Sequence, residues 1–188
     1  PQQIEKIKTS ALSYLGDNSF NSQPMLRGRI LQINGQSVQG LKVNKEVEWV
    51  LRRDRAFSWS NEMPKNTKLI SGKWWPKNYD GPLLVSIGDK IAKGMNVKIG
   101  DKIKFNILGR NFEAQIFNTR EIIWENMDIN FVFILSNSNI ANAPHSWIAT
   151  TKNVGQNLNN NFVEKIVSEF SNISAISMEE SYKAINSI

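Results

Sequence analysis

The most regular alternation of hydrophobic and polar residues lies in the segment Leu84–Arg120. Apolar positions with a period of two predict a pair of half-buried strands, at Ile103, Phe105 and Ile107 and again at Phe112, Ala114 and Ile116. Gly109-Arg110 lies between these runs and predicts the turn of a β-hairpin. Upstream, the helical spacing of Ile87, Ile91 and Ala92 predicts a short helix after a strand. Gly100-Asp101 predicts the helix-to-strand turn, because glycine tolerates positive φ and aspartate bonds nearby backbone donors.

Each end of the chain has the pattern of a helix followed by a strand. The N-terminal helical stripe is Ile4, Ile7, Ala11 and Leu15, and the C-terminal stripe is Leu158, Phe162, Val163, Ile166, Val167 and Phe170. After the first helix we expect a strand from Met25 to Ile33, ended by the turn Asn34-Gly35. After the second we expect a strand-like segment at 173–177 and a last helix at 179–188, begun by a capping box of Ser177 and Glu180. Two further strands are expected at 131–135 and 147–151.

The residues that usually carry catalysis or bind metals are sparse. The chain has no cysteine and one histidine, His145, which we interpret as an ordinary loop residue because no second histidine or cysteine can share a metal with it. The local carboxylate pairs, Glu46/Glu48, Glu121/Glu125 and Glu179/Glu180, have ordinary surface spacing. Glycine-rich phosphate loops, nucleophile elbows and EF-hand loops are absent from the sequence. We therefore expect no catalytic residue, cofactor or metal, and no enzyme.

The chain is basic, with 23 Lys and Arg against 17 Asp and Glu among 188 residues, a net charge of +6. Because the cations are spread along the sequence, we interpret them mainly as a solvated surface and expect no nucleic acid. The tightest cluster is Arg52, Arg53 and Arg55. Attraction to anionic lipid headgroups is a second use for such charge, at about 1 kcal/mol per basic residue.

Tryptophan is abundant, with six in the chain. Trp74 and Trp75 are adjacent, so in an extended segment they point to opposite faces. One of them is then a candidate contact for a substrate or partner, as a lipid-contacting edge or a carbohydrate platform; the alternative is that both pack against the local sheet. Trp49, Trp59 and Trp124 have apolar neighbours at intervals, and we expect them in the core.

Several words of this sequence resemble the extracytoplasmic domains of FtsX/MacB-type ABC-transporter permeases, and in particular the YbbP-like branch. The hairpin region Ser86–Ile116 is similar to the family's short helix, glycine-aspartate turn and hairpin. The flanking words are residues 25–29 (MLRGR), 33–35 (ING), 69–75 (LISGKWW), 124–127 (WENM) and 130–131 (NF). The residues that carry the signature are Arg27, Gly28, Asn34, Gly35, Gly72, Gly100, Asp101, Gly109, Trp124, Asn130 and Phe131.

The resemblance implies an α+β fold with a split porter-like lobe. In that arrangement two β-α-β halves, residues 1–44 and 129–188, form the porter-like lobe, and residues 45–128 form an inserted, smaller αβ lobe that contains the hairpin. The strands at 131–135 and 147–151 would return to the first lobe. The family has a strand before its first helix, whereas this sequence starts with residues 1–3 directly before the helix.

The resemblance also implies a function without chemistry. The domain would couple motion of membrane helices, driven by ATP hydrolysis in a separate cytoplasmic subunit, to export or extraction of a lipid, lipoprotein or other hydrophobic substrate. It would lie on the periplasmic side of the bacterial inner membrane, with a lysophospholipase-like hydrolase as a possible partner. No run here approaches the roughly 20 apolar residues of a membrane helix, and residues 1–15 lack a signal-peptide layout. We therefore expect the spans to lie outside these 188 residues, at both ends.

A different class of function is a free-standing binding module. Its glycine-turn hairpins would form a small barrel, and the basic surface or an exposed tryptophan would hold single-stranded nucleic acid or glycan. Such a platform needs several aromatic residues on one strand face beside Lys or Arg. Phe105, Phe112 and Phe117 instead occupy positions that look buried, which favours the permease domain.

Overall fold

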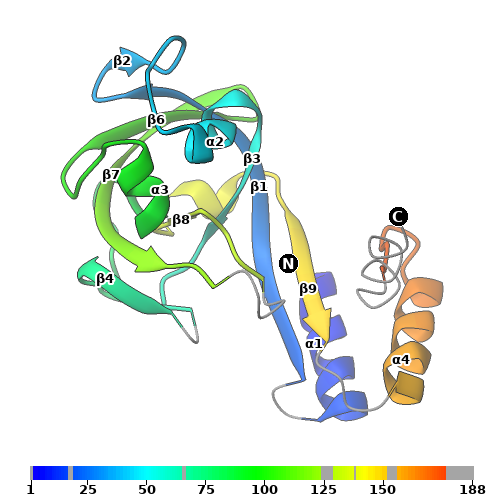
Figure 1. Cartoon of the computed structure of the whole chain (residues 1–188). Coiled ribbons are helices and arrows are strands. Elements are labelled where there is room, and N and C mark those ends of the chain that lie inside the picture. Colours follow the sequence, from blue (N-terminus) through cyan, green and yellow to red (C-terminus); the bar gives the residue numbers. More distant parts are fainter. Residues whose placement is uncertain are drawn as a thin grey trace. The chain divides into compact units, whose positions relative to one another are not determined.

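The computed structural model describes residues 2–16, 19–64, 67–123, 129–137, 139–151 and 156–176, with side chains for all of these except 139 and 156–158. The chain divides into two compact units (Figure 1). One consists of Pro1–Asn21 and Ala149–Ile188, and the other of Ser22–Ile148. The larger unit is built on a sheet and the smaller one on a pair of helices.

Six strands of the described residues close into a ring, so the larger unit is a small barrel (Figure 1). In order around the ring they are β1 (Phe20–Ile33), β3 (Arg55–Trp59), β8 (Phe133–Leu135), β5 (Leu84–Gly88), β7 (Arg110–Glu121) and β6 (Lys102–Ile107). The pairs β3–β8 and β5–β7 are parallel, and the other four are antiparallel. Closure leaves these strands with partners on both sides, which removes most of the free edges that open sheets expose.

Aromatic rings fill the inside of the barrel. Phe57 stacks between Phe105 and Phe133, with ring centroids 5.2 and 5.1 Å away. Gly28 on β1 makes room for this stack, because a Cβ atom there would lie 2.7 Å from the backbone oxygen of Asn106 and 3.3 Å from the Phe57 ring. Aliphatic side chains from the other five strands complete the core together with Phe57 and Trp59 of β3, among them Leu26, Ile30, Val85, Ile87, Ile103, Ile107, Ala114, Ile116 and Leu135.

A second layer covers part of the outside of the barrel. Strand β5 is buried along its whole length. Val85 and Ile87 face the barrel core, and Leu84 belongs to a second hydrophobic cluster, which we call the outer cluster. The other buried members of that cluster are Trp75, Phe131 and Ile134. The continuous apolar run LVSIG therefore reflects a strand with two covered faces.

The remaining elements of the larger unit lie around the ring. They are β2 (Gln36–Ser37), β4 (Lys68–Gly72) and β9 (Ser146–Thr151), the 3-10 turns η1 (Lys45–Val47) and η2 (Asn139–Asn142), and the short helices α2 (Glu48–Arg52) and α3 (Asp89–Gly94). Strand β2 pairs with β1, β4 with β7 and β9 with β1. Strand β9 extends to Thr151 and so passes the boundary between the two units.

The smaller unit is held together by two helices, α1 (Gln2–Leu15) and α4 (Gln156–Glu169). The expected stripe of α1 is buried in full, and Phe162 and Ile166 of α4 join Ile7, Ala11 and Leu15 in one cluster. Gln3 and Asn172 exchange two side-chain hydrogen bonds of 2.8 and 3.1 Å at one end of the pair. This core is much smaller than that of the barrel.

The structure confirms both helices, the hairpin and the strand that ends at Asn34-Gly35, and it corrects several local predictions. Ile87 lies in strand β5, and the helix begins only at Asp89. The hairpin turn is Leu108-Gly109, so Arg110 already belongs to β7. Residues 173–176 are irregular instead of a strand. The expected last helix at 179–188 and its capping box lie outside the described residues.

Strand pairing crosses the boundaries that we expected between the lobes. Strand β8, expected to return to the first lobe, pairs with β3 and β5, which both belong to the expected insertion 45–128. Strand β1 likewise pairs with β3 and β6 of that insertion. The fold is a mixture of helices and strands with a barrel-like ring, and a separate porter-like lobe is not confirmed. The division into 1–44 with 129–188 and 45–128 stays a prediction.

Candidate functional site

Trp74 and Trp75 pack against each other, with ring centroids 4.2 Å apart. Trp75 is 3% exposed, and its Nε1 donates a 2.9 Å hydrogen bond to the backbone oxygen of Ser60. Trp74 is half-buried at the edge of the outer cluster, and its Nε1 is buried with no hydrogen-bond partner among the described residues. Trp75 is too buried to serve as a platform, and Trp74 is partly exposed with its ring against Trp75. Their role in substrate contact stays a prediction.

The signature glycines lie where the backbone needs them. Gly35, Gly72, Gly100 and Gly109 all have positive φ, between 79° and 95°. Gly72 also approaches the backbone of β7 closely, since a Cβ atom there would lie 2.6 Å from the Phe117 oxygen. These residues therefore shape turns and close approaches of the barrel.

Asn34 and Asp101 brace two of these turns. Asn34 Oδ1 accepts a 2.8 Å hydrogen bond from the backbone nitrogen of Lys102, and its own nitrogen donates to the Lys102 oxygen at 2.8 Å. Asp101 Oδ2 accepts a 2.8 Å bond from the backbone nitrogen of Lys98. The contacts of Asn34 tie the end of β1 to the start of β6, and the bond of Asp101 closes the turn that precedes β6. Both residues therefore have a structural role.

The signature residues Asn130 and Phe131 follow segment 124–128. That segment includes Trp124 and lies outside the described residues. Asn130 Nδ2 donates a 2.8 Å hydrogen bond to the Ile123 oxygen, across that segment. Phe131 is buried, and its backbone oxygen accepts a hydrogen bond from Nη2 of Arg120. The chain on the two sides of the segment is therefore held in place by polar contacts.

Arg120 is a buried cation that the sequence pattern did not indicate. Its side chain is 3% exposed, and Nη2 also donates to the Val132 oxygen at 3.4 Å, while Nε has no partner among the described residues. Among the described residues, Arg120 forms no ion pair. Burial without a counter-ion lowers the pKa of Arg120 to about 10. The side chain clamps the segment that leads into β8.

The exposed arginines come from segments that meet beside Gly28 of β1. The chain contains seven arginines, and apart from the buried Arg120 they are Arg27, Arg29, Arg52, Arg53, Arg55 and Arg110. Strand register explains how they meet. Gly28 of β1 lies opposite Arg55 of β3 on one side and Ile107 of β6 on the other, and Ile107 pairs in turn with Arg110 of β7. A Cβ atom at Gly28 would point into the barrel, so this register starts the side chains of Arg55 and Arg110 on the inner side of the sheet and those of Arg27 and Arg29 on the outer side. We call the surface formed by Arg27, Arg29 and residues 48–55 and 106–111 the arginine face.

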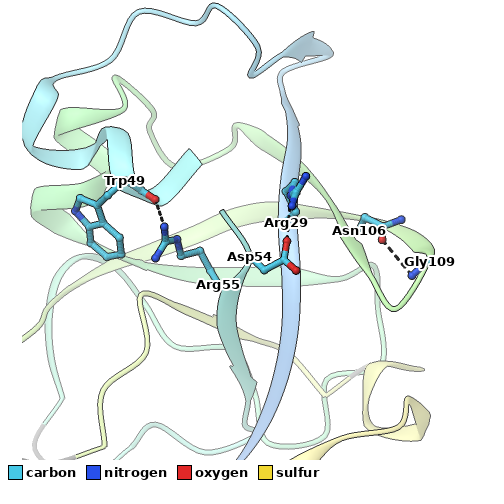
Figure 2. A network of polar contacts seen from close by, with 6 residues as sticks. All are labelled: Arg29, Trp49, Asp54, Arg55, Asn106 and Gly109. Carbon is cyan, nitrogen blue, oxygen red and sulfur yellow. Dashed lines mark hydrogen bonds and ion pairs between the residues drawn. The ribbon is translucent and has the colours of Figure 1, made fainter. Parts of the chain in front are cut away.

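Trp49 and Arg55 form one side of this face (Figure 2). The guanidinium carbon of Arg55 lies 4.7 Å from the centroid of the Trp49 ring, and its Nη2 donates to the Trp49 backbone oxygen. Trp49 is 39% exposed, so the expectation that it belongs to the core is wrong. Partial burial, with a smaller contribution from the positive charge of Arg53, lowers the pKa of Arg55. Its charge is nevertheless retained at physiological pH.

Arg29 stands at the middle of the face on the outer side of β1. Its Nε bonds Asp54 Oδ1 at 3.0 Å, with both side chains more than half exposed (Figure 2). Arg52 pairs with Glu48 on α2 at 2.6 Å. Arg27, Arg53 and Arg110 are exposed and have no ion pair among the described residues. Six arginines against two carboxylates give the face a net charge of +4.

The turn between β6 and β7 forms the other side of the face. Asn106 Oδ1 accepts a 3.1 Å hydrogen bond from the Gly109 nitrogen, and its Nδ2 donates to Asn111 Oδ1 at 2.7 Å (Figure 2). Leu108, in the turn, has φ of 48° and is 62% exposed. A leucine in this conformation is uncommon, and here the two asparagines hold it toward solvent.

The described residues do not assemble a reactive site. His145 contacts the Ala143 oxygen at 2.8 Å and packs edge-on against Trp59, as a structural loop residue does. Within the described part of the chain, no group of three or more acidic or histidine side chains could hold a metal ion. Glu121 pairs with Lys68 at 3.2 Å, while Glu125, Glu179 and Glu180 lie outside the description. The surface described above presents cations together with the exposed apolar residues Trp49 and Leu108.

Comparison with known proteins finds a distant relative among ABC transporter permeases. No family model matches the chain. Over 127 residues, 68% of the chain, it is 28% identical to the uncharacterized ABC transporter permease YbbP of Escherichia coli K12. The matched segment is 15% of that relative's length. The chain is thus distantly similar to a small part of an ABC transporter permease.

A solved structure gives a weaker likeness. It is the crystal structure of a domain of a Porphyromonas gingivalis protein that is named as a permease. It covers 86% of this chain and 68% of its own, with 8% sequence identity and a TM-score of 0.38. These values are too low to support a common fold. Among the described residues, no helix is long and apolar enough to cross a membrane.

Proposed function

We propose that this chain is an extracytoplasmic domain of an ABC-transporter permease of the FtsX/MacB type, in the YbbP-like branch. The observation that carries the proposal is the similarity to YbbP over two thirds of the chain. The domain would lie on the periplasmic side of the bacterial inner membrane. Membrane spans would continue from both ends of the sequence printed here.

Its work would be mechanical. A separate cytoplasmic subunit would hydrolyse ATP, and the membrane helices would pass the resulting motion to the domain. The helices α1 and α4 belong to one unit, so two spans would act on the same helical pair. The closed barrel has its own core, and would respond as a rigid body.

The substrate under this proposal is a lipid, lipoprotein or other hydrophobic compound that leaves the outer leaflet of the inner membrane. A lysophospholipase-like periplasmic hydrolase is a candidate partner. No catalytic residue is assigned to this chain, and the chemistry would belong to the ATPase and to any such hydrolase.

The test is to probe native cells with an antibody raised against these 188 residues. We expect a polypeptide much larger than 21.4 kDa that stays in the membrane fraction after high salt and is released only by detergent. It should be cut by external protease once the outer membrane is permeabilised. A soluble species of 21.4 kDa would contradict the proposal.

The second candidate is a free-standing binding module for nucleic acid or glycan. One observation favours it: the larger unit does form a small barrel with a basic, tryptophan-bearing surface. A soluble species in the fractionation experiment would make this module the leading function.

A further inference from the structure

We propose that the arginine face binds the phosphate groups of an anionic phospholipid bilayer. Each exposed arginine of the described residues belongs to this face, and the segments that form it contain none of the chain's sixteen lysines, although Lys104 of β6 lies two residues beyond Asn106 on the same side of the strand. Arginine offers a planar fork of donors that matches phosphate oxygens in pairs, and lysine does not. Charge alone would have allowed either residue, so the predominance of arginine in these segments points to recognition of oxyanions.

The spacing of the free guanidinium groups suits a surface of many phosphates. Arg27, Arg53 and Arg110 have no ion pair among the described residues, and they come from β1, from the lead into β3 and from β7. They are distributed over the face and do not converge on one pocket. A bilayer presents phosphates at many positions at once, which is the arrangement that distributed cations can use.

The apolar residues of the face favour lipid over another polyanion. Leu108 projects from its turn as one of the most exposed large hydrophobic residues of the described chain, and Trp49 is exposed on the other side of Arg29. Tryptophan and leucine beside basic residues are typical of segments that bind at a membrane interface.

Single-stranded nucleic acid fits less well. A stacking platform needs free aromatic faces, but the guanidinium of Arg55 lies over the Trp49 ring and covers one of its faces. Leu108 cannot stack on a base. Phe105 and Phe112 stack on each other at 6.1 Å, and Phe105 is buried in the barrel.

The turn itself carries an independent argument. The turn between β1 and β2 has two residues with positive φ, and the sequence there is Asn34-Gly35, the favoured pair. The turn between β6 and β7 has the same conformation with Leu108-Gly109. A leucine at that position costs folding free energy and gains little burial, so its presence is explained by a contact made outside the chain.

The experiment uses the 188-residue chain and vesicles of phosphatidylcholine, either pure or mixed with phosphatidylglycerol. We expect co-sedimentation with the mixed vesicles only, and release at high salt, because screening shortens the reach of exposed charges. Failure to bind mixed vesicles at low salt would overturn the proposal. Because this readout does not involve the cell's membrane fraction, it is independent of the proposed permease function.

Matched variants locate the binding surface. The double variant Arg27→Gln/Arg53→Gln should weaken binding about 30-fold, from about 1 kcal/mol for each basic residue near an anionic surface. The control Lys8→Gln/Lys90→Gln removes the same charge from exposed residues elsewhere and should retain most of the binding. Equal losses in both variants would show attraction by net charge alone and contradict the proposal.

Two more variants test the leucine and the alternative polyanion. Leu108→Asn should weaken binding several-fold, while Ile70→Asn, an exposed apolar residue of β4, should not. The same proteins are then titrated with a single-stranded oligonucleotide. Tighter binding of the oligonucleotide than of mixed vesicles, lost in Arg27→Gln/Arg53→Gln, would replace the lipid with nucleic acid.

Discussion

The adjacent residues Trp74 and Trp75 differ in whether the indole nitrogen has a hydrogen-bond acceptor. Trp75 is buried and donates through Nε1 to the Ser60 oxygen, whereas the buried Nε1 of Trp74 has no partner among the described residues. A buried donor without an acceptor costs free energy, and a satisfied one contributes it. The same substitution at the two positions should therefore have different effects.

We expect Trp75→Phe to lower the free energy of unfolding by about 1–3 kcal/mol more than Trp74→Phe does. The first variant leaves the Ser60 oxygen without its donor, and the second removes a donor that was unsatisfied. Urea unfolding followed by circular dichroism measures both variants. Equal losses would mean that packing of the two rings outweighs the hydrogen bond.

The burial of Arg120 affects how stability depends on pH. Burial lowers its pKa to about 10, so both the folded and the unfolded protein hold this proton at neutral pH. The charge therefore produces no pH dependence of stability there. A lysine in the same place would behave differently, because its ordinary pKa of about 10.4 is lower to begin with.

For Arg120→Lys we expect the free energy of unfolding to rise as the pH is raised toward about 10.4. Burial lowers the pKa of the lysine in the folded state, so the unfolded state binds more protons in this window, and stability increases with pH. The measurement is urea unfolding at several pH values, with the exposed substitution Arg53→Lys as the control. Parallel curves for the two variants would show that the lysine reaches water.

At the scale of elements, the hairpin of β6 and β7 is defined by its turn. Both central residues, Leu108 and Gly109, have positive φ, at 48° and 83°. Only the second is a residue that accepts this conformation without cost. The turn thus combines a glycine, which adopts positive φ readily, with a leucine, which does so at a cost in free energy.

Substitutions at the two turn positions should shift stability in opposite directions. Leu108→Asn should raise the free energy of unfolding by about 0.5–1 kcal/mol, because asparagine tolerates the left-handed region and Leu108 loses little burial. Gly109→Ala should lower it by about 1 kcal/mol. Thermal and urea unfolding of both variants provide the measurement. A destabilised Leu108→Asn would mean that Leu108 makes an intramolecular contact worth more than its strain.

For the whole molecule, the two units have cores of very different size. Among the residues whose side chains are described, the barrel core has more than twenty buried members, whereas the cluster of the helical pair has five. Opening free energies within one protein follow buried apolar contacts. The helices should therefore open while the barrel remains folded.

Native-state hydrogen exchange should show slower exchange in β3, β5 and β8 than in α1 and α4. Phe162→Ala should accelerate exchange in both helices, because it removes the largest buried side chain of their cluster. Exchange in the barrel strands serves as the internal control. Equal acceleration in helices and strands would mean that the two units unfold as one.

Much of the local structure could be predicted from sequence, because its causes are local. The buried stripe of α1, the alternation of β6 and β7, and the turn Asn34-Gly35 follow from periodicity and from residues that accept positive φ. The errors have local causes too. Ile87 was assigned to the helix because β5 is covered on both faces, so its apolar run lacks the alternation of a strand. The turn was placed at Gly109-Arg110 because leucine at position 108 is not a residue that indicates a turn.

What the sequence by itself determined is part of the set of elements, among them α1, α4, β1 and the hairpin of β6 and β7, whereas β3, β4 and α2 were not predicted. The tertiary structure decided which strands meet. Ladders from β1 to β3 and to β6 close the ring and bring together arginines that are up to 83 positions apart, from Arg27 to Arg110. The same pairing buries Arg120 and leaves Trp49 exposed. Contacts between distant segments depend on the register of paired backbones, and the period of a single strand contains no information about its partner.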